Sequence, residues 1–415
     1  MARRKREQVV TSSPADARDR LAQMQAVAER FAAWRPAPEV LTRVRAVPTR
    51  FVQVDFATRV GGWPIERIAT VHGPSNHGKT EFLHGLGLSF LEQSHFYGFV
   101  DAEYTTPSPW LGELMGRFAS HPGFVALRPS SFEQTVDAVR EFVELIAEAR
   151  EKGNLDPATT ALLGIDSIRK LVPDRLLEKI AKEGAQGKRG SVDGMGGRAA
   201  MYKAALQSQW LDELVPLLAS THTALVIVAR EADDPLADAN DMKYDMAWRV
   251  QGSKSLIYDA SLVVRITRDS WIRVGDGPSA SIVGERHRAR IWKTKIGGKD
   301  DKHADAFFHT GNGAEGFVGF DRARDVLELA KELGIIESAG AWLKFERHRW
   351  QGEAKCLAEL RQGLVDDVEA AVRDSFLQAQ SDPAGESSTE AAAEEEMPGA
   401  EEPVNTVEAD NTFEG

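Results

Sequence analysis

One octapeptide constrains this 415-residue chain more than any other feature. It fits the pattern GxxxxGK followed by Ser or Thr, and its residues are Gly73, Pro74, Ser75, Asn76, His77, Gly78, Lys79 and Thr80. The apolar run Ile68–Val71 precedes it, and a helical stretch begins at Glu81. In this setting backbone N–H groups and a helix N-terminus surround phosphate oxygens. The motif predicts a phosphate loop in which Lys79 reaches the β- and γ-phosphates and Thr80 binds Mg²⁺.

Two further strand ends carry acids that suit the same chemistry. Asp166 ends the apolar run Ala161–Ile165, and beside a phosphate loop such an aspartate holds Mg²⁺ through water. Asp101 and Glu103 end another strand, and hydrolysis needs a group that orients the attacking water. The residues alone leave open which carboxylate does so, or whether both are solvated strand-end acids. We expect ATP and Mg²⁺ as ligands.

Short apolar runs alternate with helical stretches over residues 46–316, which is typical of an α/β fold with a mostly parallel sheet covered on both faces. The predicted strands are Ile68–Val71, Phe96–Val100, Ala161–Ile165, Ala224–Val228, Leu262–Ile266 and Ala289–Trp292. Residues 1–45 hold a predicted helix from Ser13 to about Trp34, whose apolar stripe packs on its own core or on a neighbouring subunit. A small α/β unit is expected at 317–378, with helices at Arg322–Leu333 and after Gly352, and a disordered acidic tail at 379–415.

The composition bounds the possible partners. A single cysteine, Cys356, leaves no disulfide framework or cysteine zinc site within one chain, and no run of 18 apolar residues occurs. We therefore expect a cytoplasmic protein without a membrane partner. Of the formal net charge of −12, residues 381–415 contribute −11, which leaves −1 for the rest. The acidic total is thus compatible with a basic groove that binds nucleic acid.

Several segments in the same order resemble the RecA recombinases. Gly61-Gly62-Trp63-Pro64 is similar to the family's GGLP turn, and the segment from Val100 to Glu103 to its IDAE segment. Arg290–Ile296 resembles the strand with a Lys-x-Lys pair, and Ala339–Trp342, followed by Gln351-Gly352, the AGAW and QG elements of the C-terminal domain. The resemblance runs from about Val47 to Leu364.

The resemblance implies a RecA-type P-loop ATPase core with an N-terminal helix and a small C-terminal α/β domain. It implies that Glu103 is the catalytic base beside Lys79 and that Trp110 stacks on adenine. It also implies that Lys293 and Lys295 reach ATP held by the adjacent subunit of a helical filament. The expected activity is DNA-dependent ATP hydrolysis by a filament on single-stranded DNA that pairs with a homologous duplex in recombinational repair.

Two loops are implied to contact DNA. The first spans about Leu176 to Gly197 and is rich in glycine and cations. The second spans about Glu231 to Gly252 and is rich in aspartates, which repel phosphates. The predicted DNA-binding residues of both loops and their borders are Lys182, Lys188, Arg189, Arg198, Arg230, Lys243, Trp248 and Arg249. The family has Asn-Gln where Ala229-Arg230 stands here, so a phosphate-sensing or DNA-binding role of Arg230 departs from its pattern.

Two other functions stay open. A ring-forming motor of the same fold, such as a hexameric helicase or a clock-type ATPase, would share the phosphate loop. The AGAW-like element and the lone N-terminal helix favour the recombinase over such a ring. A nucleotide-dependent scaffold with weak DNA binding is suggested by the acidic second loop and Arg230. Closed rings in electron micrographs would favour the motor, and ATP turnover that ignores single-stranded DNA would favour the scaffold.

Overall fold

A computed structural model describes residues 44–105, 109–185, 197–234, 237, 248–275, 280–296, 304–314 and 318–381. The predicted N-terminal helix and the predicted tail beyond Ser381 lie outside the described residues, as do Lys188, Arg189 and Lys243. Among the described helices, none combines the length and the apolar character that crossing a membrane requires.

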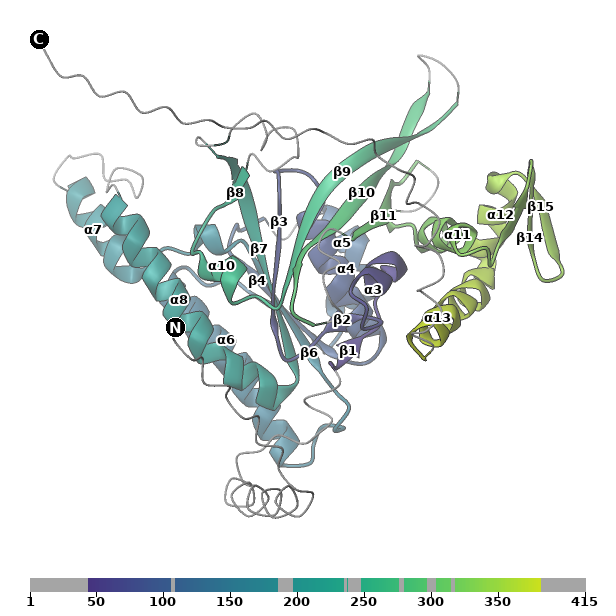
Figure 1. The fold of residues 1–415 in the computed structure, drawn as a ribbon. Coiled ribbons are helices and arrows are strands. Elements are labelled where there is room, and N and C mark those ends of the chain that lie inside the picture. Colours follow the sequence, from purple (N-terminus) through teal and green to yellow (C-terminus); the bar gives the residue numbers. More distant parts are fainter. Residues whose placement is uncertain are drawn as a thin grey trace, which may run out of the picture.

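A large, mostly parallel central sheet organises the molecule (Figure 1). Its strands lie in the order β12-β11-β10-β9-β3-β7-β6-β4-β5, and β8 pairs with β7. The bounds are β3 Ile68–Gly73, β4 Phe96–Asp101, β5 Phe124–Leu127, β6 Ala161–Asp166, β7 Thr223–Asp233, β8 Trp248–Val250, β9 Leu262–Val274, β10 Ser281–Thr294, β11 Asp305–Asn312 and β12 Val318–Phe320. All six predicted strand runs are confirmed. The α/β class and the parallel core are confirmed as well.

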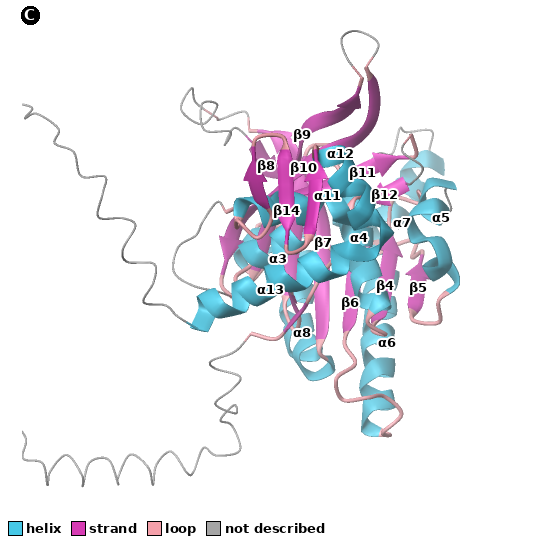
Figure 2. Cartoon of the chain, turned by 90° about the vertical axis from the view of Figure 1, so that its right-hand side faces the viewer, coloured by secondary structure: helices cyan, strands magenta, loops and turns pink. Residues whose placement is uncertain are grey.

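Helices cover both faces of this sheet (Figures 1 and 2). One face carries α3 (Val52–Ala57), α4 (Lys79–Glu92) and α5 (Pro109–Met115). The other carries α6 (Phe132–Glu151), α8 (Gly197–Thr221) and α10 (Ser255–Tyr258). Because strand side chains alternate, Val226 and Val228 of β7 enter the first core, and Leu225 and Ile227 enter the second. Burial on both faces explains why these strands read as continuous apolar runs.

The C-terminal part has a third core. It contains α11 (Arg322–Glu332), a three-stranded antiparallel sheet, α12 (Glu353–Glu359) and α13 (Val365–Ser381). The sheet consists of β13 (Glu337–Ala339), β14 (Trp342–Phe345) and β15 (His348–Gln351). The sequence predicted helices at Arg322–Leu333 and after Gly352, and both are present as α11 and α12. The domain boundaries stay a prediction, since Val52 of α3 also packs into this third core.

The two expected DNA loops are shorter than predicted. The beginning of the first is helical, because α7 (Asp174–Ala185) covers it and buries Leu176, and residues 186–196 lie outside the described part. Leu176 and Ile180 lie four positions apart and so share one helix face. This spacing indicates a helix, but the glycine content of the segment favoured a loop in the sequence prediction. The second loop begins and ends as a hairpin ladder, in which Glu231 of β7 pairs with Val250 of β8. Its middle lies outside the described residues.

A buried ion pair joins the C-terminal helix to the core. Asp55 of α3 is 1% exposed and accepts hydrogen bonds from Thr49 and from Arg373 Nη1 of α13, the latter at 3.0 Å. Arg373 also donates to the Thr49 carbonyl oxygen at 2.7 Å. Burial raises the pKa of Asp55 to about 7, although Arg373 and Thr49 act to lower it.

We expect replacement of Arg373 by alanine to destabilise the fold more at high pH than at low pH. The raised pKa means that the stability contributed by Asp55 is complete below its unfolded pKa and is lost as pH rises towards about 7. Without Arg373 the folded pKa rises further, so the penalty of a buried unpaired carboxylate reaches about 3 kcal/mol at pH 8. Urea titrations at pH 5.5 and pH 8 measure the difference. Adding Asp55→Asn to the Arg373→Ala variant should abolish the pH dependence of the destabilisation. An equal loss of unfolding free energy by Arg373→Ala at both pH values would contradict this account.

Candidate functional site

The phosphate loop adopts a backbone that its glycines make possible. Gly73 has φ +153°, and a Cβ there would lie 2.1 Å from the Ile266 carbonyl oxygen of β9. Gly78 has φ +89° and precedes α4, so the left-handed residue stands at the N-terminus of the helix. Lys79 is 7% exposed, and its Nζ donates to the Pro74 carbonyl oxygen at 2.5 Å. The lysine thus lies folded over the loop, and burial lowers its pKa.

Strands β9 and β10 support this loop from outside, a contact that no local sequence pattern predicts. Arg268 Nη2 donates to the Asn76 carbonyl oxygen at 2.6 Å, and the Arg268 backbone N–H donates to His77 Nδ1 at 3.0 Å. His287 Nδ1 lies 3.2 Å from the His77 carbonyl oxygen. Arg268 and His287 follow their partners in the loop by 191 to 210 positions, so only the sheet order brings them to it.

Thr80 and Asp166 meet as a metal site of this type requires. Thr80 Oγ1 donates to Asp166 Oδ2 at 2.5 Å. Burial raises the pKa of Asp166 to about 6, the Thr80 hydrogen bond lowers it, and the neighbouring Glu103 raises it. Among the described residues no cluster of three His, Cys, Asp or Glu side chains could enclose a metal. A hydroxyl and one carboxylate suit Mg²⁺, which keeps waters and phosphate oxygens as its other ligands.

The structure separates the two candidate water-orienting carboxylates. Asp101 is fully buried and accepts hydrogen bonds from the Thr105 backbone N–H at 3.0 Å and from Arg128 Nε at 3.2 Å. Glu103 is 17% exposed at its side chain and accepts from Ser167 Oγ at 2.8 Å. Arg230 Nη2 also donates to both Glu103 oxygens, at 2.8 and 2.7 Å. Glu103 is therefore the carboxylate at the open side of the site.

Lys293 and Lys295 lie at the opposite edge of the sheet from the phosphate loop of their own chain. Strand β10 runs antiparallel to β9, so its end meets the start of β9 and β3: Lys293 pairs with Val263, which pairs with Thr70. Lys293 Nζ donates to the Ile257 and Tyr258 carbonyl oxygens at 2.5 and 2.7 Å. Lys295 Nζ donates to Tyr258 at 2.9 Å. The pair is thus held at the C-terminus of α10, away from Lys79.

Trp110 lies on α5 and packs partly against the first core. Its ring meets His84 of α4 edge-on, with centroids 6.4 Å apart. The predicted stacking on adenine stays a prediction.

The structure brings two of the predicted DNA-binding cations together. Lys182 of α7 and Arg198 of α8 line a hollow of about 650 Å³ between these helices. Arg175 and Lys179 also line it, and the Arg175 guanidinium lies 5.6 Å from the ring centre of Tyr202. Sequence reasoning missed Arg175, Lys179 and Tyr202; it assigned Lys179 to a loop and placed the other two outside that loop. Helical spacing of Arg175, Lys179 and Lys182 was the signal that could have found them.

Trp248 and Arg249 begin strand β8. The Trp248 ring packs against His72 at 4.7 Å and against Trp292 at 5.0 Å, and the Arg265 guanidinium lies 4.9 Å from its centre. Arg249 is exposed. The tryptophan is thus part of an aromatic cluster at the base of the hairpin, and its predicted contact with bases stays a prediction.

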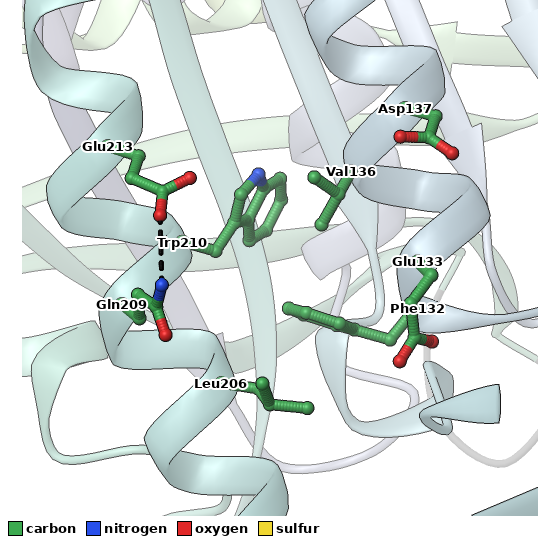
Figure 3. A pocket seen from close by; sticks show the side chains of 8 residues that line it. All are labelled: Phe132, Glu133, Val136, Asp137, Leu206, Gln209, Trp210 and Glu213. Atoms are coloured by element: carbon green, nitrogen blue, oxygen red, sulfur yellow. Dashed lines mark hydrogen bonds between the residues drawn. The ribbon is translucent and has the colours of Figure 1, made fainter. Parts of the chain in front are cut away.

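A second hollow, of about 220 Å³, lies between α6 and α8. Trp210 from α8 faces Phe132 and Val136 from α6 across it (Figure 3). Its lining includes Glu133 and Glu213 and holds no basic residue, so it does not suit a phosphate ligand.

Comparisons with known proteins find relatives that are similar over most of the chain. No family model matches the chain. Protein RecA of Thermus thermophilus is 26% identical over 339 residues, which cover 80% of this chain and 85% of that protein. Protein RecA of Chloroherpeton thalassium is 25% identical over 343 residues, covering 82% and 83%. Protein RecA 2 of Myxococcus xanthus is 26% identical over 337 residues, covering 80% and 81%. Over about four fifths of its length the chain is thus similar to proteins of the RecA family, as a divergent relative.

Proposed function

We propose that this protein is an ATP-dependent DNA recombinase that forms filaments on single-stranded DNA and catalyses homologous pairing and strand exchange. The observation that carries the proposal is the division of its nucleotide-binding groups between two edges of one sheet. Lys79, Thr80 and Asp166 lie at one edge, and Lys293 and Lys295 lie at the other. A nucleotide bound at one edge would meet the lysine pair of a second copy, and repetition of this contact gives a helical polymer.

Each residue at the phosphate loop has a distinct task in this proposal. Lys79 leaves the Pro74 carbonyl oxygen and binds the β- and γ-phosphates, whose charge it neutralises. Thr80 and Asp166 would hold Mg²⁺, which neutralises charge on the transferred phosphoryl group. Glu103 orients the attacking water and accepts its proton. Lys293 and Lys295 of the adjacent subunit neutralise further charge that develops at the γ-phosphate.

The hollow between α7 and α8 supports the DNA part of the proposal. Four of its eight lining residues are cations and one is an acid. Such a surface follows a phosphate backbone without reading bases, and base pairing between the two DNA strands then supplies sequence recognition. Formation of filaments with ATP and single-stranded DNA, followed by strand exchange with a homologous duplex, tests the function as a whole.

We expect Glu103→Gln to retain ATP binding and to slow hydrolysis at least about a hundredfold, because the amide cannot accept the proton. Steady-state phosphate release and equilibrium ATP binding measure the two effects separately. Glu113→Gln, which removes a carboxylate from the exposed side of α5, is the matched control. Normal turnover by Glu103→Gln would remove this residue from the mechanism.

Mixing two inactive variants tests whether Lys293 acts between subunits. Lys79→Ala lacks a working phosphate loop but retains the lysine pair, and Lys293→Ala has the opposite defect. With random assembly, about a quarter of the contacts in an equal mixture are intact, so about a quarter of the DNA-stimulated ATP turnover should return. Mixing Lys293→Ala with the Lys79→Ala/Lys293→Ala double variant should restore none. No recovery in the first mixture would rule out the assignment between subunits.

We expect the Lys182→Gln/Arg198→Gln variant to bind single-stranded DNA more weakly and with less salt dependence. Each lost phosphate contact should reduce the slope of log affinity against log salt by about 0.7. Filter binding across a salt series measures the slope. Arg117→Gln/Lys152→Gln removes two exposed cations elsewhere and serves as the control. An unchanged slope in the first variant would show that the hollow does not hold the strand.

A further inference from the structure

Arg230 and Glu103 form a contact beside the phosphate loop that the mechanism above does not use. Arg230 belongs to β7, and its backbone pairs with Gly73 at the start of the loop. Glu103 follows β4, which is separated from β7 by β6. The guanidinium therefore reaches across the end of β6, past Asp166, to hold the carboxylate. Arg230 and Glu103 thus form a salt bridge in the space that faces the phosphate loop.

Two side chains restrain Glu103 in this position. Arg230 Nη2 donates to both carboxylate oxygens, at 2.8 and 2.7 Å. Ser167 Oγ, which is fully buried, donates to Oε1 at 2.8 Å. A carboxylate whose two oxygens both accept from one guanidinium is held in a single orientation. Both oxygens of Glu103 are thus already engaged by protein donors, so the carboxylate is not free to orient a water.

Arg230 is also placed to bind a phosphate. Burial lowers the pKa of Lys79, and Asp166 opposes this shift. The positive charge of Arg230 lowers the pKa of Lys79 further, so the two cations are electrostatic neighbours. Only Nη2 of Arg230 is engaged with Glu103, and within the described part of the chain Nη1 and Nε make no hydrogen bond. The side chain is 33% exposed. Donors therefore remain for a second anion, and arginine binds phosphate oxygens in pairs.

We propose that Arg230 is a positioning residue that restrains Glu103 until the γ-phosphate of a bound nucleoside triphosphate takes over its guanidinium. This inference rests on the proposed role of Glu103 in hydrolysis. A γ-phosphate carries more charge than the carboxylate and offers more acceptor oxygens, so it competes effectively for Arg230. A diphosphate lacks the group that would compete. Release of Glu103 then follows from the arrival of ATP and does not follow from that of ADP.

The exchange predicts a specific pattern of nucleotide affinity. Glu103→Gln frees Arg230 in advance, so a non-hydrolysable ATP analogue with Mg²⁺ should bind about tenfold more tightly than to the wild type. Arg230→Gln should weaken binding of the analogue about tenfold. ADP affinity should be unchanged in both variants. In the Arg230→Gln background, Glu103→Gln should no longer tighten binding, because no guanidinium remains to be freed.

The experiment measures both nucleotides on the full chain for the wild type, the two single variants and the double variant. Arg140→Gln, which removes an arginine from a surface pair with Glu213 at 3.7 Å, is the matched control and should change neither affinity. ADP affinity and the thermal midpoint report on folding. Arg230→Lys, which keeps the charge but loses the paired donors, should recover part of the analogue affinity.

Three outcomes overturn the inference. If Arg230→Gln lowers the affinities for ADP and analogue equally, the pair is only structural. If Glu103→Gln leaves analogue binding unchanged or weakens it, the carboxylate does not compete with the γ-phosphate. If the effects of the two substitutions simply add, Arg230 and Glu103 act independently. The reverse pattern, a coupling that appears with the analogue and is absent with ADP, supports the exchange.

These nucleotide-binding measurements need neither DNA nor strand exchange. Their result can therefore be distinguished from a failure of the proposed function. Coupling in a protein whose ATP turnover ignores single-stranded DNA would support the exchange and count against the recombinase. If the coupling is absent in a protein that performs strand exchange, the recombinase is supported and the exchange of Arg230 between Glu103 and the γ-phosphate is contradicted.

Discussion

The parallel register of the central strands is the constraint on which the site depends. Strands β3, β7, β6 and β4 lie side by side and run in one direction, so their carboxyl ends meet at one edge. Gly73, Arg230, Asp166 and Asp101 stand at or near these ends. A slip of one position in any strand would turn its side chains to the other face. Burial of β7 on both faces prevents such a slip, because the side chains of both faces fit packed cores.

Charges gathered at one edge must be paired to stay there. The structure pairs them across strands: Thr80 with Asp166, Arg230 with Glu103, and His72 and Arg265 with Glu231. The last group lies beneath Trp248, at the base of the hairpin formed by β7 and β8. Arg230 and Glu231 are neighbours in β7. Arg230 contacts Glu103 beside the phosphate loop, and Glu231 contacts the group at the base of the hairpin. If a nucleotide displaces Glu103 from Arg230, as proposed, the change occurs on the strand that also carries Glu231.

The antiparallel strands add a second consequence. Because β10 returns alongside β9, the strand that supports the phosphate loop through His287 carries Lys293 at its far end. Figure 1 shows β9 and β10 as the longest ribbon of the sheet, reaching beyond the other strands. One strand therefore connects the nucleotide edge with the opposite edge. In the proposed polymer, this strand would connect neighbouring nucleotide sites directly.

Local patterns in the sequence were sufficient for the phosphate loop, the six strand runs and the α/β class, since each depends on neighbours in the chain. The sequence also identified Asp166, Asp101 and Glu103 as strand-end acids, and the family resemblance, though not the residues alone, favoured Glu103 over Asp101. The tertiary structure gave the two carboxylates different partners, because Arg128 engages Asp101 and Arg230 engages Glu103. It alone brought Arg268 to the loop and placed Lys293 at the opposite edge. Those contacts depend on sheet order and strand direction, which join residues that are remote in the chain.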